Sequence, residues 1–206
     1  MAKRYNQYCP VAHALDVVGE RWSLLIVREL NHGPLRYTDL HERLGCGTNI
    51  LAARLRDLEG GGVVQKRKLP PPAASTVYEL TASGEGLRSV LHALGWWGLR
   101  TLGPPPADVV LQPGWLRGAL QMALWSVALA GTIEFRASGE VAFVVDGDVV
   151  AAATGEPDTI VEADPVGLYH LLVDGDLDSV EVSGDRALLE GLLGALPTPP
   201  PLPASV

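Results

Sequence analysis

The chain has 206 residues, of which 47% are hydrophobic, and a formal net charge of −8 at pH 7. Residues 1–105 carry 13 basic and 9 acidic side chains, net +4, whereas residues 106–206 carry 3 and 15, net −12. This asymmetry predicts two modules, and only the first can approach a phosphate backbone. With two cysteines, no secretory signal at its start and no apolar run of the ~20 residues that a membrane span needs, the chain is expected to be cytoplasmic and to have no membrane partner.

The first half is predicted to form short helices, two strands and a longer helix. Apolar periodicity and turn residues predict helices over 10–18, 22–30, 38–44 and 48–59, with Thr38 and Thr48 as N-caps. Strands over 63–69 and 76–80 follow, separated by a proline-rich tip. A long amphipathic helix capped by Thr81 or Ser83 then extends to Leu102, and prolines 104–106 form a rigid linker.

The helix over 48–59 carries most of the functional prediction. Leu51, Leu55 and Leu58 form one apolar line that is expected to face inward. The residues left on the outer face are Thr48, Asn49, Ala52, Ala53 and Arg56. Small alanine side chains let a helix approach base edges closely, and Asn49 can contact a base edge or a phosphate. This outer face is therefore the predicted base-reading surface.

Cations on the same half predict a DNA partner for that helix. The predicted phosphate contacts are Arg36, Arg54, Arg56, Lys66, Arg67 and Lys68. A helix-turn-helix followed by a basic wing holds one helix in the major groove of double-stranded DNA. Two alternatives remain open: the module binds a protein instead, and single arginines are ordinary surface residues, with Arg54 pairing to Asp57 or Glu59.

The second half is predicted to be an α+β layer fold with antiparallel strands. Strands are expected over 132–137, 141–145, 149–153, 159–163 and 180–182, and helices over 115–129, from Pro165 and after Asp185. Asp164 and Asp185 are the predicted caps, and Asp146-Gly147 favours a type I′ turn. One apolar set either lines a ligand cavity or fills a solid core: Trp115, Met122, Trp125, Phe135, Phe143 and Tyr169.

Residues 5–102 resemble the HxlR family of winged helix-turn-helix transcription regulators. The matching segments are Cys9-Pro10, 18–26, 28–30, 33–40, 48–52, Arg54-Leu55, Val63-Val64 and 78–81 with Gly84. The resemblance implies a homodimer whose terminal helices pair on an inverted-repeat operator. This chain departs from the family at Cys46, where an apolar residue is usual, and at Ala53, where a polar or acidic residue is common. Base contacts therefore cannot be copied from relatives.

Residues 108–196 are similar to sterol-carrier-protein type two-like domains. The matching features are the Phe135/Phe143 hairpin register, Asp164-Pro165 before a leucine-rich helix, and the segment 180–185 before the last helix. This likeness implies an apolar cavity between sheet and helices. The fold class expected for the whole chain is α+β, with a winged-helix domain over 1–103, a linker over 104–114, a sterol-carrier-like domain over 115–196 and a disordered tail over 197–206.

Together these features predict a sequence-specific DNA-binding regulator controlled by a small apolar ligand. One alternative is an apolar-ligand carrier that uses the winged helix only to dimerise. Another is redox sensing through Cys9, a position that holds sensing cysteines in some HxlR members, although Cys9 can equally be a small packing residue. Cys9 and His13 are too few ligands for a zinc site, and no catalytic constellation or cofactor motif is found.

Overall fold

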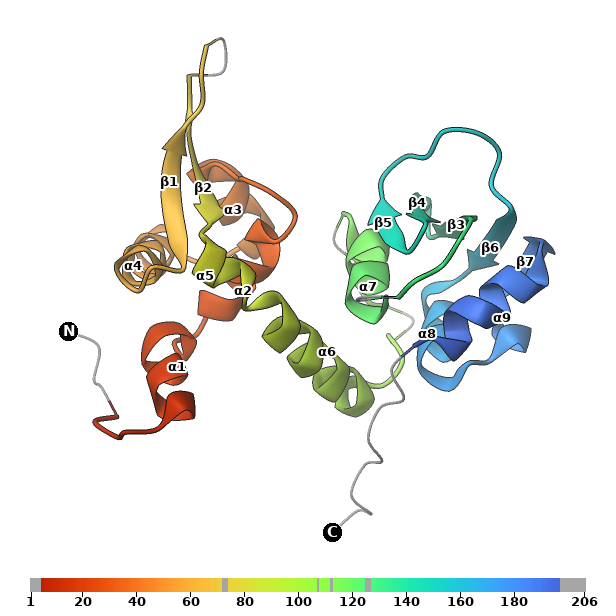
Figure 1. Ribbon diagram of the computed structural model, residues 1–206, viewed down its shortest axis with the longest axis horizontal. Helices are drawn as coiled ribbons and strands as arrows, with labels where there is room; N and C mark the ends of the chain where they lie inside the picture. The colour runs from red at the N-terminus through yellow and green to blue at the C-terminus, as the bar shows by residue number, and fades with distance from the viewer. Residues whose placement is uncertain (1–4, 72–73, 107, 112, 125–126, 197–206) are drawn as a thin grey trace. The chain divides into compact units, whose positions relative to one another are not determined.

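The computed structural model describes residues 5–71, 74–106, 108–111, 113–124 and 127–196 (Figure 1). The chain divides into two compact units, Met1–Leu91 and His92–Val206. The division falls inside helix α6, ahead of the proline run that the sequence marks as a boundary. Each unit has its own hydrophobic core.

Four short helices build the body of the first unit, as predicted. They are α1 (Pro10–Val18), α2 (Ser23–Leu30), α3 (Tyr37–Leu44) and α4 (Thr48–Gly60). Their core consists of side chains such as Ile26, Leu40, Leu51 and Leu58, each 0% exposed. Leu55 is 2% exposed, so the predicted inward line of α4 is confirmed. Each of these leucines contributes roughly 1.5–3 kcal/mol through burial.

The predicted N-caps of α3 and α4 are wrong by one or two positions. Helix α3 begins at Tyr37, with Arg36 as its N-cap, because the Asp39 carboxylate accepts the Arg36 backbone N–H at 3.0 Å. Helix α4 begins at Thr48 itself, after Gly47, and no side chain caps it. Gly45 (φ 63°) makes the turn between the two helices in the left-handed region that glycine tolerates.

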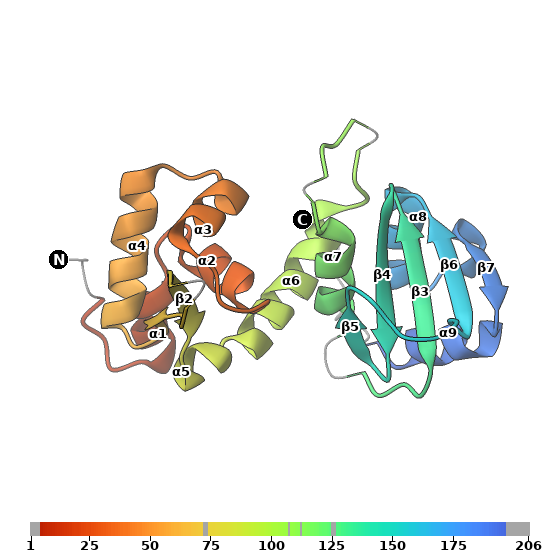
Figure 2. The same cartoon turned by 90° about the horizontal axis from the view of Figure 1, so that it is seen from above.

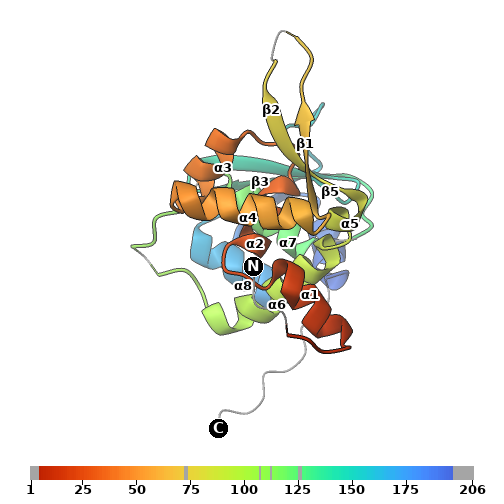
Figure 3. The ribbon, with the colours of Figure 1, turned by 90° about the vertical axis from the view of Figure 1, so that its left-hand side faces the viewer.

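A two-stranded wing follows α4 and projects from the helical body (Figure 3). Its strands are β1 (Val64–Lys68) and β2 (Thr76–Leu80), paired antiparallel with Lys66 opposite Tyr78. The other edge of β2 is bridged by Leu35 through Tyr78. The predicted hairpin is confirmed, and the bridge at Leu35 joins it to the segment between α2 and α3.

The predicted long helix after the wing is interrupted. Thr81 caps the short helix α5 (Ala82–Glu85) by accepting the Gly84 N–H at 3.1 Å. A Cβ at Gly84 would lie 2.2 Å from the Val63 carbonyl oxygen, so only glycine allows α5 to pack this closely on the start of the wing. The chain then restarts as α6 (Arg88–Leu102).

The adjacent tryptophans of α6 have different surroundings, as expected from neighbouring positions on a helix. Trp96 is 6% exposed and belongs to the core of the second unit, and its indole N–H donates to His92 Nε2 at 3.0 Å. Partial burial lowers the pKa of His92, which keeps the imidazole neutral and able to accept this bond. Trp97 is 67% exposed.

The second unit is a five-stranded sheet with its helices packed on one face (Figure 2). The strand order is β5-β4-β3-β6-β7, with bounds Asp148–Val150, Glu140–Val145, Thr132–Ala137, Thr159–Ala163 and Glu181–Gly184. Strands β3 and β6 pair parallel, so the predicted antiparallel sheet is corrected to a mixed one. The cause is the crossover from β5 at one edge to β6 on the far side of β3, after which β6 runs in the same direction as β5 and β3.

The helices of this unit are α7 (Trp115–Ala123), α8 (Pro165–Asp174), the 3-10 turn η1 (Leu177–Ser179) and α9 (Arg186–Gly194). Asp164 and Asp185 cap α8 and α9 as predicted. The helix predicted over 115–129 is too long. It ends at Ala123, and buried Val127 then packs beside the β4–β5 turn, where a Cβ on Gly147 would lie 2.1 Å from the Val127 carbonyl oxygen. Asp146 (φ 50°) and Gly147 (φ 90°) fit the expected type I′ turn.

Candidate nucleic-acid interface

Helix α4 presents a polar outer face opposite its buried leucines. Thr48 and Asn49 are exposed, and Ala52 and Ala53 are partly exposed on the same helix. The Tyr37 hydroxyl donates to the Thr48 carbonyl oxygen at 2.7 Å, which ties the first residue of α4 to α3. Sequence reasoning missed this bond because nothing in the spacing of an aromatic side chain shows where its hydroxyl will point. The outer face is thus held at its N-terminal end by a neighbouring helix.

The arginines predicted to contact phosphate differ in their availability. The Arg54 guanidinium lies 3.0 Å from the Asp57 carboxylate and 3.4 Å from that of Glu20, and its side chain is only 21% exposed. Arg56 is exposed and its Nε donates to the Ala52 carbonyl oxygen at 3.2 Å. No ion pair of Arg36 is seen among the described residues. Arg54 is therefore committed to the protein, whereas Arg36 and Arg56 keep charge that a phosphate can use.

The three cations of the wing do not share a face. Alternate residues of a strand point to opposite sides, so Lys66 and Lys68 lie on one face of β1 and Arg67 on the other. The Lys66 ammonium lies 5.5 Å from the centre of the Tyr78 ring, which is directly opposite on β2. A DNA backbone that contacts the face of β1 with Lys66 and Lys68 would therefore not contact Arg67.

Two of these cations are already paired with carboxylates. Lys66 Nζ lies 2.7 Å from Glu59 Oε2, and this hydrogen bond raises the pKa of Lys66. Arg67 Nε lies 2.7 Å from Glu79 Oε2, a hydrogen bond that lowers the pKa of Glu79. Lys68 has no carboxylate partner among the residues that the structure describes. In the free protein, Lys68 is therefore the wing cation with uncompensated charge.

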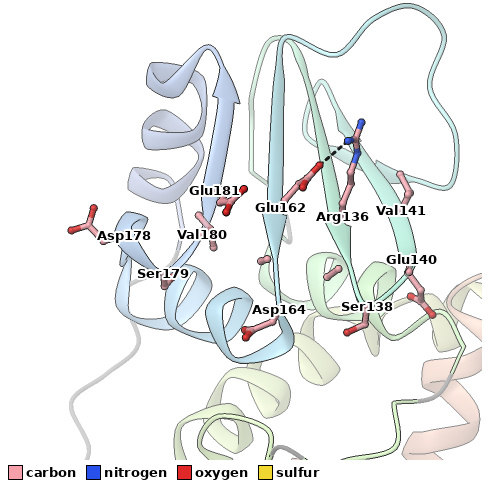
Figure 4. A pocket seen from close by; sticks show the side chains of 13 residues that line it. Arg136, Ser138, Glu140, Val141, Glu162, Asp164, Asp178, Ser179, Val180 and Glu181 are labelled. Atoms are coloured by element: carbon pink, nitrogen blue, oxygen red, sulfur yellow. Dashed lines mark hydrogen bonds and ion pairs between the residues drawn. The ribbon is translucent and has the colours of Figure 1, made fainter.

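The second unit has an open hollow at one end of its sheet, drawn in Figure 4. Its charged lining includes Arg136, Glu140, Glu162 and Asp164, most of which already have structural partners. Arg136 pairs with Glu162 at 2.7 Å and with Glu134. Glu140 accepts the backbone N–H groups of two residues at the start of α7, and Asp164 caps α8. These contacts explain the carboxylates of Glu140, Glu162 and Asp164 through the fold, without a ligand.

The residues predicted to line an apolar cavity are dispersed. Phe135 is 1% exposed in the core, with Trp115 and Met122 packed against that core. Phe143 lies on the opposite face of the sheet, because it is paired with Glu134 while Phe135 is paired with Ala142. Tyr169 is partly buried on α8, and Trp125 lies outside the described residues. The hairpin register expected from the likeness to sterol-carrier domains is therefore corrected, because Phe135 and Phe143 lie on opposite faces of the sheet.

The remaining sequence features carry no site in the described part of the chain. Cys9 immediately precedes α1, is partly exposed and forms no disulfide, and its predicted redox role stays a prediction. Cys46 is buried in the core of the first unit. Among the described residues no group of three or more potential metal ligands is found, and none of their helices has the length and apolar character to cross a membrane.

The segment that resembles known proteins comprises the first unit and helix α6. A family model described as HxlR-like helix-turn-helix matches residues 17–105. The uncharacterized HTH-type transcriptional regulator sll1512 of Synechocystis is 38% identical over 87 residues, 42% of this chain and 64% of its own length. The HTH-type transcriptional regulator YodB of Bacillus subtilis is 31% identical over 111 residues, 53% of this chain and 91% of its own. The solved reduced form of YodB covers 45% of this chain and 92% of that one at 31% identity, with a TM-score of 0.41.

Proposed function

The chain belongs to the HxlR-like helix-turn-helix family, and on this premise we propose that it is a DNA-binding transcription regulator that recognises a specific operator. The observation that carries the proposal is the outer face of α4. Its residues Thr48, Asn49, Ala52 and Ala53 lie outside the hydrophobic core, and the wing follows the helix directly. In this role Thr48, Asn49 and the Ala52–Ala53 surface face base edges, while Arg36, Arg56 and Lys68 contact phosphates. A footprint on DNA upstream of its own gene tests the proposal: a protected segment supports it, and uniform cleavage contradicts it.

A homodimer is the second part of the proposal. Helix α1 exposes Val11 (66%) and Leu15 (42%), two apolar residues four positions apart on one side of the helix. Helix α6 exposes Leu94 (45%), Trp97 (67%) and Leu102 (80%). Exposed apolar side chains of this kind on each helix mark an interaction site, and a second copy of the chain is the occupant that we propose. Two α4 helices related by a two-fold axis would enter successive major grooves about 34–36 Å apart, which requires an inverted repeat.

The wing geometry predicts unequal contributions from its cations. Lys68→Gln is expected to weaken binding to any DNA sequence by about five- to tenfold at ~0.1 M salt, because one uncompensated phosphate contact is lost. The slope of log K against log salt should become shallower by about 0.9. Arg67→Gln is the matched control, since Arg67 lies on the other face and is paired with Glu79. Equal losses in both variants, measured by fluorescence anisotropy over a salt series, would contradict the face assignment.

Control by a small apolar ligand in the second unit is the third part of the proposal. Its support is the separate core of that unit and its negative net charge, which disfavours contact with DNA. A ligand can regulate only if it binds more tightly to one arrangement of the two DNA-reading helices than to the other. Native mass spectrometry of the purified dimer should reveal a bound apolar molecule, and stripping it should change operator affinity. An unliganded dimer whose operator affinity ignores added apolar compounds would rule this part out.

A further inference from the structure

One ion pair joins the recognition helix to the wing. The Glu59 carboxylate in the last turn of α4 lies 2.7 Å from the ammonium of Lys66 on β1, across the glycine turn at 60–62. The Tyr78 ring lies beside the same ammonium, 5.5 Å from ring centre to nitrogen. Both charged side chains remain reachable from solvent, Lys66 at 43% and Glu59 at 37% exposure. The pair can therefore open without disturbing the core.

The stability of the fold does not account for this carboxylate. A negative charge in the last turn of a helix opposes the helix dipole, so Glu59 is unfavourable for α4 on its own. An ion pair this exposed also adds little to folding stability. The stronger consequence concerns charge: with Glu59 attached, Lys66 offers no net charge to a phosphate.

Resting on the proposed DNA-binding function, we propose that Glu59 is a positioning residue that competes with the DNA backbone for Lys66. For Lys66 to contact a phosphate, its ammonium must leave Glu59, and the freed carboxylate then stays beside the polyanion. When Lys66 contacts a phosphate, a counterion is released from the DNA, which favours binding. The newly exposed Glu59 carboxylate beside the phosphates offsets this gain. Lys66 therefore contributes less to affinity and to salt dependence than its position on the wing would otherwise give it. Glu59 thereby keeps overall DNA affinity below what the wing cations can provide.

The full-length variant Glu59→Gln tests this inference on both an operator duplex and an unrelated duplex. Affinity for both is expected to rise about two- to fivefold at ~0.1 M salt, and the salt slope should steepen by up to about 0.9. Glu85→Gln is the matched control, because it also removes one carboxylate from an exposed ion pair, with Arg88 at 2.6 Å, but on α5 and not beside a cation of β1. Thermal unfolding should confirm that both variants fold like the wild type.

A double-mutant cycle distinguishes the mechanism from simple charge repulsion. In a Lys66→Gln background, Glu59→Gln is expected to change neither affinity nor salt slope, since the cation over which it competes is gone. An affinity gain that persists in that background, or one equal to that of Glu85→Gln, would overturn the inference while leaving DNA binding intact. A wild-type protein that binds neither duplex would instead overturn the proposed function itself.

Discussion

Ala52→Glu is expected to lower operator affinity by at least about 100-fold while leaving the fold intact. Ala52 is partly exposed on the flank of α4, beside the outward residues Asn49 and Arg56 and outside the line of buried leucines. A glutamate there would separate the helix from base edges and bring a negative charge to the phosphates. Each good base contact contributes about 1–3 kcal/mol, so the loss of two or more accounts for the expected effect. Titration of labelled operator with the variant measures it.

The control for that experiment is Ala187→Glu. Ala187 is an exposed alanine near the start of α9 in the second unit, so the chemical change and the net charge change are the same. Operator affinity should stay within about twofold of wild type, since surface changes away from the interface act mainly through net charge. Similar losses in both variants would show that α4 does not face the DNA.

Leu94→Glu is expected to weaken self-association by at least about 100-fold. Leu94 is 45% exposed on α6, and a dimer that covers this face would bury one unpaired carboxylate from each copy, at a cost of several kcal/mol. Operator binding should weaken with it, because a monomer reaches only one half-site. Sedimentation velocity over a concentration series measures the first effect.

Val141→Glu provides the comparison for the dimer experiment. Val141 is 48% exposed on β4, on the sheet face away from the core. The variant places a glutamate at a site of nearly the same exposure as Leu94. It should leave the dimer unchanged. A Leu94→Glu variant that sediments like wild type and like Val141→Glu would remove α6 from the interface.

Sequence alone predicted the elements whose periodicity and caps are local. The inward leucines of α4, the wing hairpin, the buried face of β3 and the caps Asp164 and Asp185 all follow from side-chain alternation and short-range hydrogen bonding. The outer face of α4 could be named for the same reason, because committing three leucines inward fixes what remains outside. These predictions need no knowledge of distant contacts.

The features that sequence did not predict depend on partners far along the chain. The parallel pairing of β3 with β6 and the placement of Phe143 away from Phe135 follow from strand order and register, which a crossover sets. The pair Glu59–Lys66 forms only where β1 meets the end of α4, and the pair Glu79–Arg67 forms only where β1 pairs with β2, so three adjacent cations that were predicted to contact phosphate differ in their ion pairs.

The most direct test is the ratio of affinities for operator and scrambled DNA at ~0.15 M salt. The duplexes should have equal length, with the operator taken from the footprinted segment. Sequence-specific regulators typically bind their sites 10³-fold or more above bulk DNA, and we expect a ratio of at least about 10³ for this dimer. A ratio near one, with binding that vanishes as salt rises, would mean that α4 reads no sequence and would contradict the account.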